Sequence, residues 1–346
     1  MESAHTRNID ENRVLILWGW WSTYTFIITE LDLQMSSASL PVQCNRIDHY
    51  TIIVPDAKRV SDFHHQVLGY DFLKLKEINA GSVPVGQVDM LNYIHEWPDR
   101  SGRVMVITEG LTDNSIFRRY MSKYGQGIHH VALQVDDLEQ AFSTLKDHGV
   151  KTTSDNIVID ILSGLKQIFI DNSDTGVFIE LIERSKNADK EMDATEKGFF
   201  TQNNMAGLAD TMHNYIADVK PTCAGSEHAH SSTALAKIAT LQIREFVLVV
   251  DDPHSSAVFF EKYFGFERSA DAPRNTVRIY LTSEPELSFL CVARGGSVNN
   301  HQLHCVAQLQ GREWVGLPDF KVGANKDSVH ITETTSGYSM HIRNCA

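Results

Sequence analysis

The sequence predicts an α+β protein made of tandem βαβββ units that pair into two domains. One order, a β-rich run, an amphipathic helix and further β-rich runs, recurs along the chain. Four such units follow one another at spacings of about 50 to 100 residues, and an internal repeat constrains the fold more strongly than any single predicted strand. A polar stretch after the second unit separates the first pair from the second.

The first pair of units is the more regular one. In the first unit a β-rich run precedes a segment with apolar residues at helical spacing, and Gly69 ends this helix. The runs are RIDHYTIIV, the helix PDAKRVSDFHHQVLGY, and then DFLKLKEI, QVDMLNYI and GRVMVIT. The second unit has GIHHVALQV, the helix DLEQAFSTLKDHGV, and then KTTSD, KQIFID and GVFIELIE.

The second pair repeats this order less regularly. The third unit contains LQIREFVLVV, the helix DPHSSAVFFEKYFGF, TVRIYLT and LSFLCVA, and the fourth contains LHCVAQLQ, DSVHIT and GYSMHIRN. The predicted domains are therefore residues 46–184 and 241–346. Residues 185–240 have the polar composition of a linker, with a lid-like helix near 205–216.

Residues 1–45 are predicted to be an extension that supplies an added strand or an interface segment. The apolar core of this extension, residues 14–28, is shorter than the ~20 residues that a membrane span needs. Acidic residues nearly cancel Arg7 and Arg13, and no small-residue cleavage site follows, so a signal peptide is not predicted either. We therefore expect no membrane partner.

Composition narrows the classes of partner and the compartment. The formal net charge is -13 and the sequence contains no dense basic run, which argues against nucleic-acid binding. The five cysteines are scattered and none forms a CxxC pair, so we expect neither a zinc knuckle nor a disulfide framework. A small molecule as partner and a reducing, cytoplasmic location are the simplest expectations.

Two histidines and one glutamate stand at matching places of the first two units. His49 and His130 open the first strand of each unit, whereas His129 is offset by one residue. Because strand side chains alternate between faces, His129 is predicted to face away from the site that His130 faces. Glu180 lies between apolar residues of the last strand, where a carboxylate is costly unless a cation or hydrogen bonds compensate it.

His49, His130 and Glu180 together form a set of hard and borderline metal ligands. Such a set suits one divalent ion, Fe, Mn, Co, Ni or Zn, and leaves coordination positions open for a substrate or oxygen.

With these residues the chain resembles the vicinal oxygen chelate superfamily, which includes glyoxalases, bleomycin-resistance proteins and dioxygenases. The resemblance covers residues 46–184 well and 241–346 loosely. It implies that paired βαβββ modules form a cupped, mixed sheet around a divalent metal, with ligands at His49, His130 and Glu180. It also implies a homodimer, because this superfamily often assembles its sheets across subunits.

Three groups within the superfamily are similar to this chain. The run from ITEGLTDNSIFRRYMSKYG through GIHHVALQVDD looks like methylmalonyl-CoA epimerase, although Val106 stands where that family has a fourth ligand and Val85 or a neighbour where it has a catalytic glutamate. LKQIFIDNSDTGVFIELIER, followed by EKGFFTQNNMAGLADTM, looks like 4-hydroxyphenylpyruvate dioxygenase, which carries its metal in the C-terminal domain. The cyclitol epimerases that act on 2-epi-5-epi-valiolone are similar in general scale and acidity.

Acidic side chains that could line the cup are candidates for proton transfer. Glu77 and Glu109 are the predicted acid–base residues, and Glu180 is counted with them beside its ligand role. The remaining polar candidates are Asp89, Asn92, Tyr93, His95 and Gln134. Alternation puts Asp89 and Tyr93 on one face of their strand and Met90 and Asn92 on the other, and leaves open which face sees the metal.

The predicted function is that of a metal-dependent epimerase or isomerase. It would move a proton at the carbon next to a metal-chelated carbonyl of a small polar ketone, for example a cyclitol such as 2-epi-5-epi-valiolone. The alternative is an Fe(II) dioxygenase acting on a 2-keto acid, and a third class is a non-catalytic binding or resistance protein. In the second domain, Glu245, Cys305 and His341 are assigned to the matching strand positions. They form either a rearranged metal set or part of a domain kept for packing and dimerisation.

Overall fold

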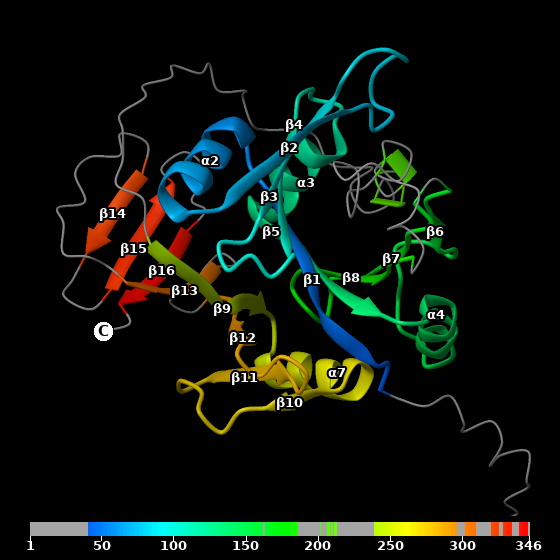
Figure 1. Cartoon of the computed structure of the whole chain (residues 1–346). Helices are drawn as coiled ribbons and strands as arrows, with labels where there is room; N and C mark the ends of the chain where they lie inside the picture. The colour runs from blue at the N-terminus through cyan, green and yellow to red at the C-terminus, as the bar shows by residue number, and fades with distance from the viewer. Residues whose placement is uncertain are drawn as a thin grey trace, which may run out of the picture. The chain divides into compact units, whose positions relative to one another are not determined.

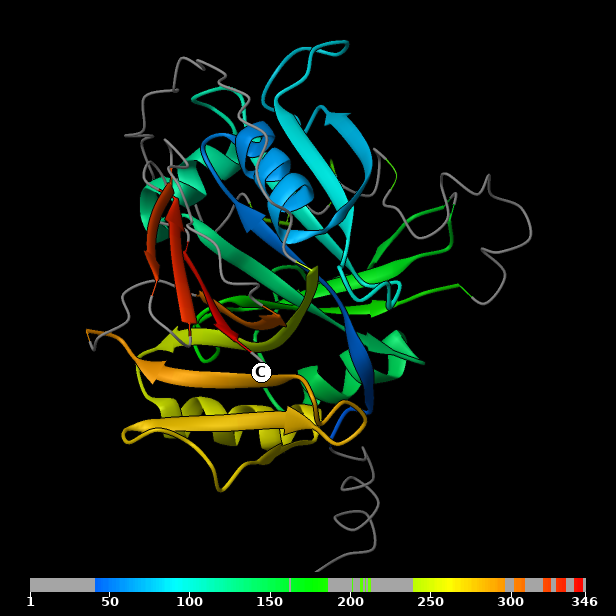
Figure 2. The same cartoon turned by 60° about the vertical axis from the view of Figure 1, so that its left-hand side comes forward.

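The structure is a computed structural model. It describes residues 41–161, 163–185, 201, 206, 207, 209, 211, 212, 239–295, 302–308, 320–324, 328–333 and 339–344. The predicted α+β fold of paired βαβββ modules is confirmed, with two mixed sheets of eight strands each (Figures 1 and 2). Residues 1–40 of the predicted extension lie outside the described residues.

The first sheet combines two modules in the strand order β2-β3-β4-β1-β5-β8-β7-β6. Its central strands β1 and β5 are antiparallel to one another, and each pairs in parallel with the last strand of its own module. The elements of the first module are β1 (Cys44–Ile53), α2 (Ala57–Phe63) with the π-helical turn η1 (His64–Leu68), β2 (Asp71–Ile78), β3 (Met90–Glu96) and β4 (Val104–Gly110). After α3 (Ile116–Tyr124) the second module has β5 (Gly127–Val135), α4 (Leu138–Asp147), β6 (Val158–Ile159), β7 (Lys166–Ile170) and β8 (Phe178–Glu183).

The second sheet repeats this topology in the order β10-β11-β12-β9-β13-β16-β15-β14. Its elements are β9 (Ala239–Val250), α7 (Pro253–Phe264), β10 (Phe266–Arg268), β11 (Thr276–Leu281), β12 (Ser288–Ala293), β13 (Gln302–Gln308), β14 (Phe320–Ala324), β15 (Ser328–Glu333) and β16 (Ser339–Asn344). Sequence reasoning missed β14, whose five residues include a glycine and give a weak strand pattern. The segment between β13 and β14 lies outside the described residues.

The first three modules begin their helices in the same way. An aspartate directly before the helix accepts a hydrogen bond from a backbone N–H of the first turn, as Asp56, Asp137 and Asp252 do for α2, α4 and α7. Gly69 and Gly265 follow the first and third of these helical segments with positive φ angles of 84° and 68°, which a glycine adopts without strain. These signals explain why the helices were predicted correctly from the sequence.

Residues of both sheets share one hydrophobic core. The ring of Tyr50 on β1 lies 5.4 Å from Phe246 on β9 and 5.6 Å from Trp97, and all three side chains are buried. Residues 41–346 accordingly form one compact unit. The domain boundaries at residues 184 and 241 stay predictions.

None of the helices among the described residues is both long and apolar enough to cross a membrane.

Candidate metal centre

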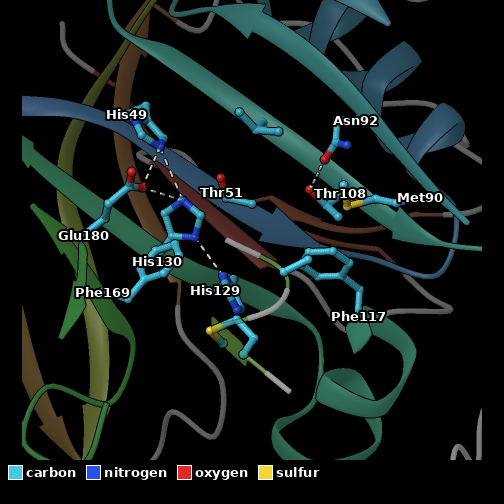
Figure 3. A pocket seen from close by; sticks show the side chains of 13 residues that line it. His49, Thr51, Met90, Asn92, Thr108, Phe117, His129, His130, Phe169 and Glu180 are labelled. Atoms are coloured by element: carbon cyan, nitrogen blue, oxygen red, sulfur yellow. Dashed lines mark hydrogen bonds and ion pairs between the residues drawn. The ribbon is translucent and has the colours of Figure 1, made fainter. Parts of the chain in front are cut away.

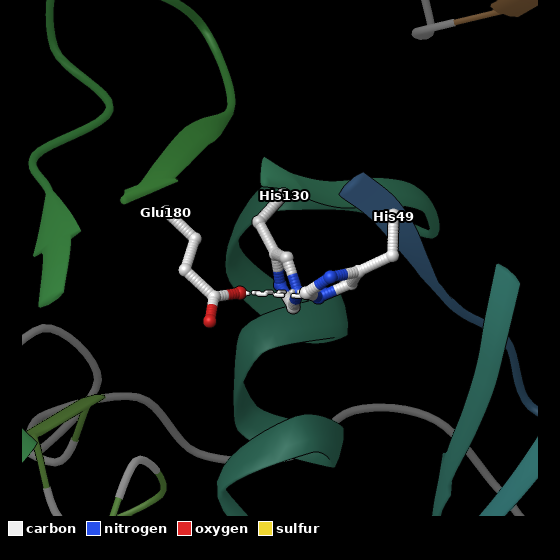
Figure 4. A group of neighbouring side chains, drawn as sticks. All are labelled: His49, His130 and Glu180. Carbon is white, nitrogen blue, oxygen red and sulfur yellow. Dashed lines mark hydrogen bonds and ion pairs between the residues drawn. The ribbon is translucent and has the colours of Figure 1, made fainter. Parts of the chain in front are cut away.

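His49, His130 and Glu180 come together on three neighbouring strands, β1, β5 and β8 (Figure 4). Ala132 on the middle strand pairs with His49 on one side and with Glu180 on the other, which fixes the relative height of the two ligands. Glu180 Oε2 lies 3.1 Å from His49 Nε2 and 3.3 Å from His130 Nε2. The two Nε2 atoms are 3.3 Å apart.

This spacing fits a divalent ion. Metal–ligand bonds of about 2.0 to 2.2 Å, at octahedral to tetrahedral angles, separate neighbouring donor atoms by about 2.8 to 3.6 Å. Glu180 is fully buried, its Oε1 has no hydrogen-bond partner, and its Oε2 contacts the two ligand histidines. A buried carboxylate in that condition is costly unless a cation compensates it, so the predicted set is suited to holding a metal.

Two β-bulges shape the centre. In the β1–β5 ladder Ile47 pairs with Leu133 and His49 with Ala132, so Asp48 is the extra residue on β1. Thr51 pairs with His130 and Ile52 with Ile128, which makes His129 the extra residue on β5. Both histidines of this pair line the same pocket (Figure 3). The prediction that His129 faces away from the site is therefore wrong, because a bulge interrupts the alternation on which it rested.

The two bulge residues hold the two ligand rings. His49 Nδ1 donates to Asp48 Oδ1 at 2.9 Å, and Arg184 contacts both oxygens of Asp48 at 2.6 and 2.7 Å. His129 Nδ1 lies 2.7 Å from His130 Nδ1. Each ligand is thus fixed through Nδ1, which leaves its Nε2 directed at the shared position.

The two ligand histidines, His49 and His130, have different electrostatic surroundings. Burial alone would raise the pKa of Asp48, but the hydrogen bonds and charge of Arg184, with a smaller part from His49, hold it far below its ordinary value. Burial alone would lower the pKa of His49, but the charge of Glu180 and the bond to Asp48 raise it to about 9. Burial and the nearby His129 and His49 hold the pKa of His130 well below its ordinary value. Without a cation, a proton on His49 balances Glu180, and metal binding would displace that proton.

The pocket beside the centre has a mainly apolar wall with a few polar groups (Figure 3). Its empty space, counted out into the open solvent at its mouth, is about 480 Å³. Besides the three ligands it is lined by Thr51, Met90, Asn92, Val106, Thr108, Phe117, His129, Phe169, Ala209 and Met212. Sequence reasoning missed most of these residues. Phe169 pairs with Glu180 across β7 and β8, and Ala209 and Met212 lie in the segment near 205–216 that was predicted to be a lid-like helix.

Val106 occupies the place on the first module that Glu180 occupies on the second. Thr51 pairs with Val106 as Ala132 pairs with Glu180, and Thr51 and Ala132 each follow a ligand histidine by two residues. The predicted position of Val106 is therefore supported by the strand register. Within the described residues the centre has three protein ligands, and the apolar side chain of Val106 occupies the position of a fourth ligand.

Two of the predicted acid–base residues do not reach the pocket. Glu77 is exposed on the edge strand β2. Glu109 is buried but accepts a hydrogen bond from Ala57 N at 2.9 Å, because it follows pocket-lining Thr108 by one residue and so faces the side of α2. Of the three predicted catalytic residues, only Glu180 is in the site.

The pocket shows which face of β3 lies toward the metal site. Met90 and Asn92 line it, whereas His95 faces α2, with Nε2 2.8 Å from Ser61 Oγ. Asp89 accepts hydrogen bonds from Ala80 N and Ser82 N and so holds the preceding loop. Tyr93 and Gln134 are not among the lining residues.

The second sheet carries a different set at the equivalent positions. The register of β9 and β13 places Gln302, and not Cys305, at the equivalent of His130, because Gln302 pairs with Val247 as His130 pairs with Thr51. The assignment of Cys305 is therefore wrong, because Cys305 lies three residues further along β13.

Glu245 and His341 do occupy the equivalents of His49 and Glu180. Both pair with His304, as His49 and Glu180 both pair with Ala132. Arg278 Nε lies 2.6 Å from Glu245 Oε1, so a protein side chain neutralises this carboxylate. Among the residues that the structure describes, His49, His130 and Glu180 form the single group suited to a metal.

Fold and site together define a family. The family model of the Glyoxalase/Bleomycin resistance protein/Dioxygenase superfamily matches residues 46–156, and the chain belongs to this superfamily. The chain is 30% identical over 141 residues to the uncharacterized protein YqjC of Bacillus subtilis (strain 168), which covers 40% of this chain and 92% of YqjC. It is also 30% identical over 149 residues to the mitochondrial methylmalonyl-CoA epimerase of Mus musculus, covering 43% of this chain and 78% of that protein.

A solved structure of methylmalonyl-CoA epimerase from Mycobacterium tuberculosis is also similar. It is 22% identical, with a TM-score of 0.36 over 45% of this chain and 98% of that chain. Each of these three similarities spans less than half of the chain.

Proposed function

We propose that this protein is a divalent-metal-dependent epimerase or isomerase. It would move a proton at the carbon next to the carbonyl of a small polar ketone, of which a cyclitol such as 2-epi-5-epi-valiolone is one example. The observation that carries the proposal is the buried group of His49, His130 and Glu180 at the end of a small-molecule pocket. The similarity to a protein named as an epimerase supports the same reaction class.

The three ligand residues would have two roles, metal binding and proton transfer. A bound divalent ion would supply a Lewis acid that acidifies the carbon next to a coordinated carbonyl. Glu180 is the one carboxylate among the described pocket-lining residues, and its Oε1 atom accepts no hydrogen bond. We assign removal of the proton to this carboxylate; a solvent proton delivered to the opposite face would complete the epimerisation, and Glu180 would release its proton to solvent.

The apolar wall would protect this step from bulk water. Phe169 packs against His130 with ring centroids 5.0 Å apart, and Phe117 and Met212 line the same pocket. Partial exclusion of water strengthens the electrostatic interactions within the site.

A second candidate function is an Fe(II)-dependent dioxygenase acting on a 2-keto acid. Val106 favours it, because two histidines and one carboxylate with an apolar fourth wall match the facial arrangement of non-haem iron oxygenases. This candidate uses the same three ligands with a different substrate and co-substrate.

Metal analysis of the purified protein, combined with assays of one ketone in D₂O with and without oxygen, separates these functions. Deuterium incorporation without oxygen uptake supports the epimerase, and oxygen uptake with bound iron supports the dioxygenase. Failure to bind any divalent metal would overturn both and leave a non-catalytic binding protein.

A further inference from the structure

Two buried side chains of the pocket have hydrogen-bonding atoms that no protein group satisfies. Asn92 on β3 is fully buried, and its Oδ1 accepts from Thr108 Oγ1 at 2.7 Å, but its Nδ2 has no partner. His129 is 2% exposed, and its Nε2 also has no partner. Buried polar groups are nearly always paired, so two unsatisfied ones in one pocket require an explanation.

The tautomer of His129 follows from the role of His130. Coordination through Nε2 leaves the proton of His130 on Nδ1, which then donates to His129 Nδ1 at 2.7 Å. His129 must therefore carry its own proton on Nε2. His129 is packed among the rings of Phe117, Tyr120 and Phe178, where burial disfavours a charged ring, so its Nε2–H is a neutral donor.

These donors lie in a pocket without a positively charged side chain. No lysine or arginine lines it among the residues that the structure describes. The nearest such group of the centre, Arg184, contacts both oxygens of Asp48. Two neutral donors select neutral acceptor oxygens such as hydroxyls, whereas a phosphate or an acyl-CoA chain requires cations or helix N-termini.

The two donor groups, Nδ2 of Asn92 and Nε2 of His129, lie away from the metal ligands. This arrangement suits a small molecule that extends along the pocket. In Figure 3 the triad lies at one end of the lining residues and Asn92 with Thr108 at the other, with His129 between them. A ketone coordinated at one end would present its distal oxygens to Asn92 and those near its middle to His129. The remaining wall is apolar, formed by Met90, Val106, Phe117, Phe169 and Met212.

We propose that Asn92 and His129 are the specificity-determining residues of this pocket and that they select a neutral, polyhydroxylated small ketone. The coordinated carbonyl in this proposal rests on the proposed function, whereas the two hydrogen-bond donors do not depend on it. It assigns to both residues a hydrogen bond to a substrate hydroxyl, made by Nδ2 of Asn92 and Nε2 of His129.

Calorimetric binding to the metal-loaded full chain tests this proposal with two probes. 2-Keto-myo-inositol and 2-hydroxycyclohexanone share the α-hydroxyketone unit and differ in their distal hydroxyls. We expect the wild type to prefer the inositol ketone, and Asn92→Leu to lower that preference about tenfold while changing affinity for hydroxycyclohexanone by less than about twofold. His129→Phe should also lower the preference, compared at equal metal content because His129 supports His130.

Gln167→Leu is the matched control. Gln167 is likewise a fully buried amide with unsatisfied atoms, on β7 of the same sheet, but it does not line the pocket. Its replacement should leave the preference between the probes unchanged. Circular dichroism and metal content establish that each variant is folded and loaded.

The remaining outcomes are decisive. Equal binding of the two probes by the wild type, no binding of either, tighter binding of methylmalonyl-CoA, or an unchanged preference in Asn92→Leu would each overturn the proposal. A retained, Asn92-dependent preference without any deuterium exchange would support the specificity residues while refuting the epimerase function.

Discussion

The residue before each ligand histidine determines how that ligand is held. Asp48 and His129 occupy equivalent bulge positions and contact the Nδ1 atoms of His49 and His130. One partner is an anion paired with Arg184, and the other is a neutral ring. A carboxylate behind an imidazole increases its basicity, so His49 is expected to be the stronger donor to a metal.

Asp48→Asn should weaken metal binding by about 10- to 100-fold, because the neutral amide no longer polarises His49. Competition with a chromophoric chelator measures this affinity directly. Asp56→Asn is the matched control in the same module, since Asp56 caps α2 and asparagine caps helices equally well. An unchanged affinity in folded Asp48→Asn would contradict the supporting role of the carboxylate.

Replacing the histidines themselves separates ligand from supporting residue. His130→Ala should abolish metal binding, whereas His129→Ala should retain it with affinity reduced by about 10- to 100-fold. Metal content after dialysis against the free ion distinguishes the two. The reverse result would show that the strand register of β5 differs from the one described.

At the scale of elements, the first module buries two histidines between α2, η1 and β3. His64 donates through Nδ1 to Val60 O, and burial lowers its pKa to about 4 although that bond opposes the shift. Burial, with the charges of His64 and His65, lowers the pKa of His95 to about 3. Both rings are therefore neutral in the folded protein at neutral pH.

This burial predicts acid sensitivity. Because each folded pKa lies below the unfolded value of about 6.5, the unfolded chain binds more protons as the pH falls, and the free energy of unfolding decreases. Each histidine should contribute a loss of about 1.4 kcal/mol per pH unit, from about pH 6.5 to about pH 4 for His64 and pH 3 for His95. Urea denaturation at pH 7.5 and 5.5 measures the loss.

His64→Phe should remove the contribution of one histidine to the loss in free energy of unfolding between pH 7.5 and 5.5. Leu68→Met changes a fully buried neighbour without a titratable group, so it should shift stability equally at both pH values. An unchanged pH dependence in His64→Phe would refute the buried neutral state of His64.

The sequence predicted most elements and the ligands but not the local geometry around them. Periodicity, the capping aspartates and Gly69 determine the helices locally, so the repeat could be recognised without a structure. The bulges at Asp48, His129 and Arg244 leave no such mark, because they depend on pairing between strands distant in sequence. The bulge at His129 accounts for the wrong prediction of its orientation.

Sequence reasoning could not place Glu77 and Glu109 relative to the pocket for a related reason. Glu77 and Glu109 are carboxylates in strands of the first module, and sequence gives their spacing but not which face of the sheet forms the cup. The structure assigns that face to Met90 and Asn92 of β3 and to Val106 and Thr108 of β4. Asn92 could be inferred only as one of two alternatives.

For the whole molecule, the shared core joins the two sheets. Tyr50 and Phe246 pack across it, Glu284 accepts from Ile47 N at 2.7 Å, and Arg103 forms an ion pair with the same glutamate. Ser256 Oγ donates to Asp174 O, a further contact between the two halves. These contacts predict that residues 41–346 unfold as one cooperative unit.

Phe246→Ala should therefore lower the free energy of unfolding by about 3 to 5 kcal/mol while keeping a single transition. Urea denaturation followed by tryptophan fluorescence and by far-UV circular dichroism tests this. Val258→Ala, an exposed position on α7, is the control and should change stability little. Two separate transitions in the wild type would show that the sheets unfold independently.

The pairing of Glu245 with Arg278 has a consequence for how the protein depends on its surroundings. In the second sheet the positive charge is covalently attached to the chain, so it is present from synthesis onward and cannot be stripped by a chelator. In the first sheet Glu180 pairs with His49 and His130, and its positive counterpart would be either a proton on His49 or a bound ion. Loss of a bound ion should therefore leave both sheets folded, so that the protein could bind the ion again without refolding.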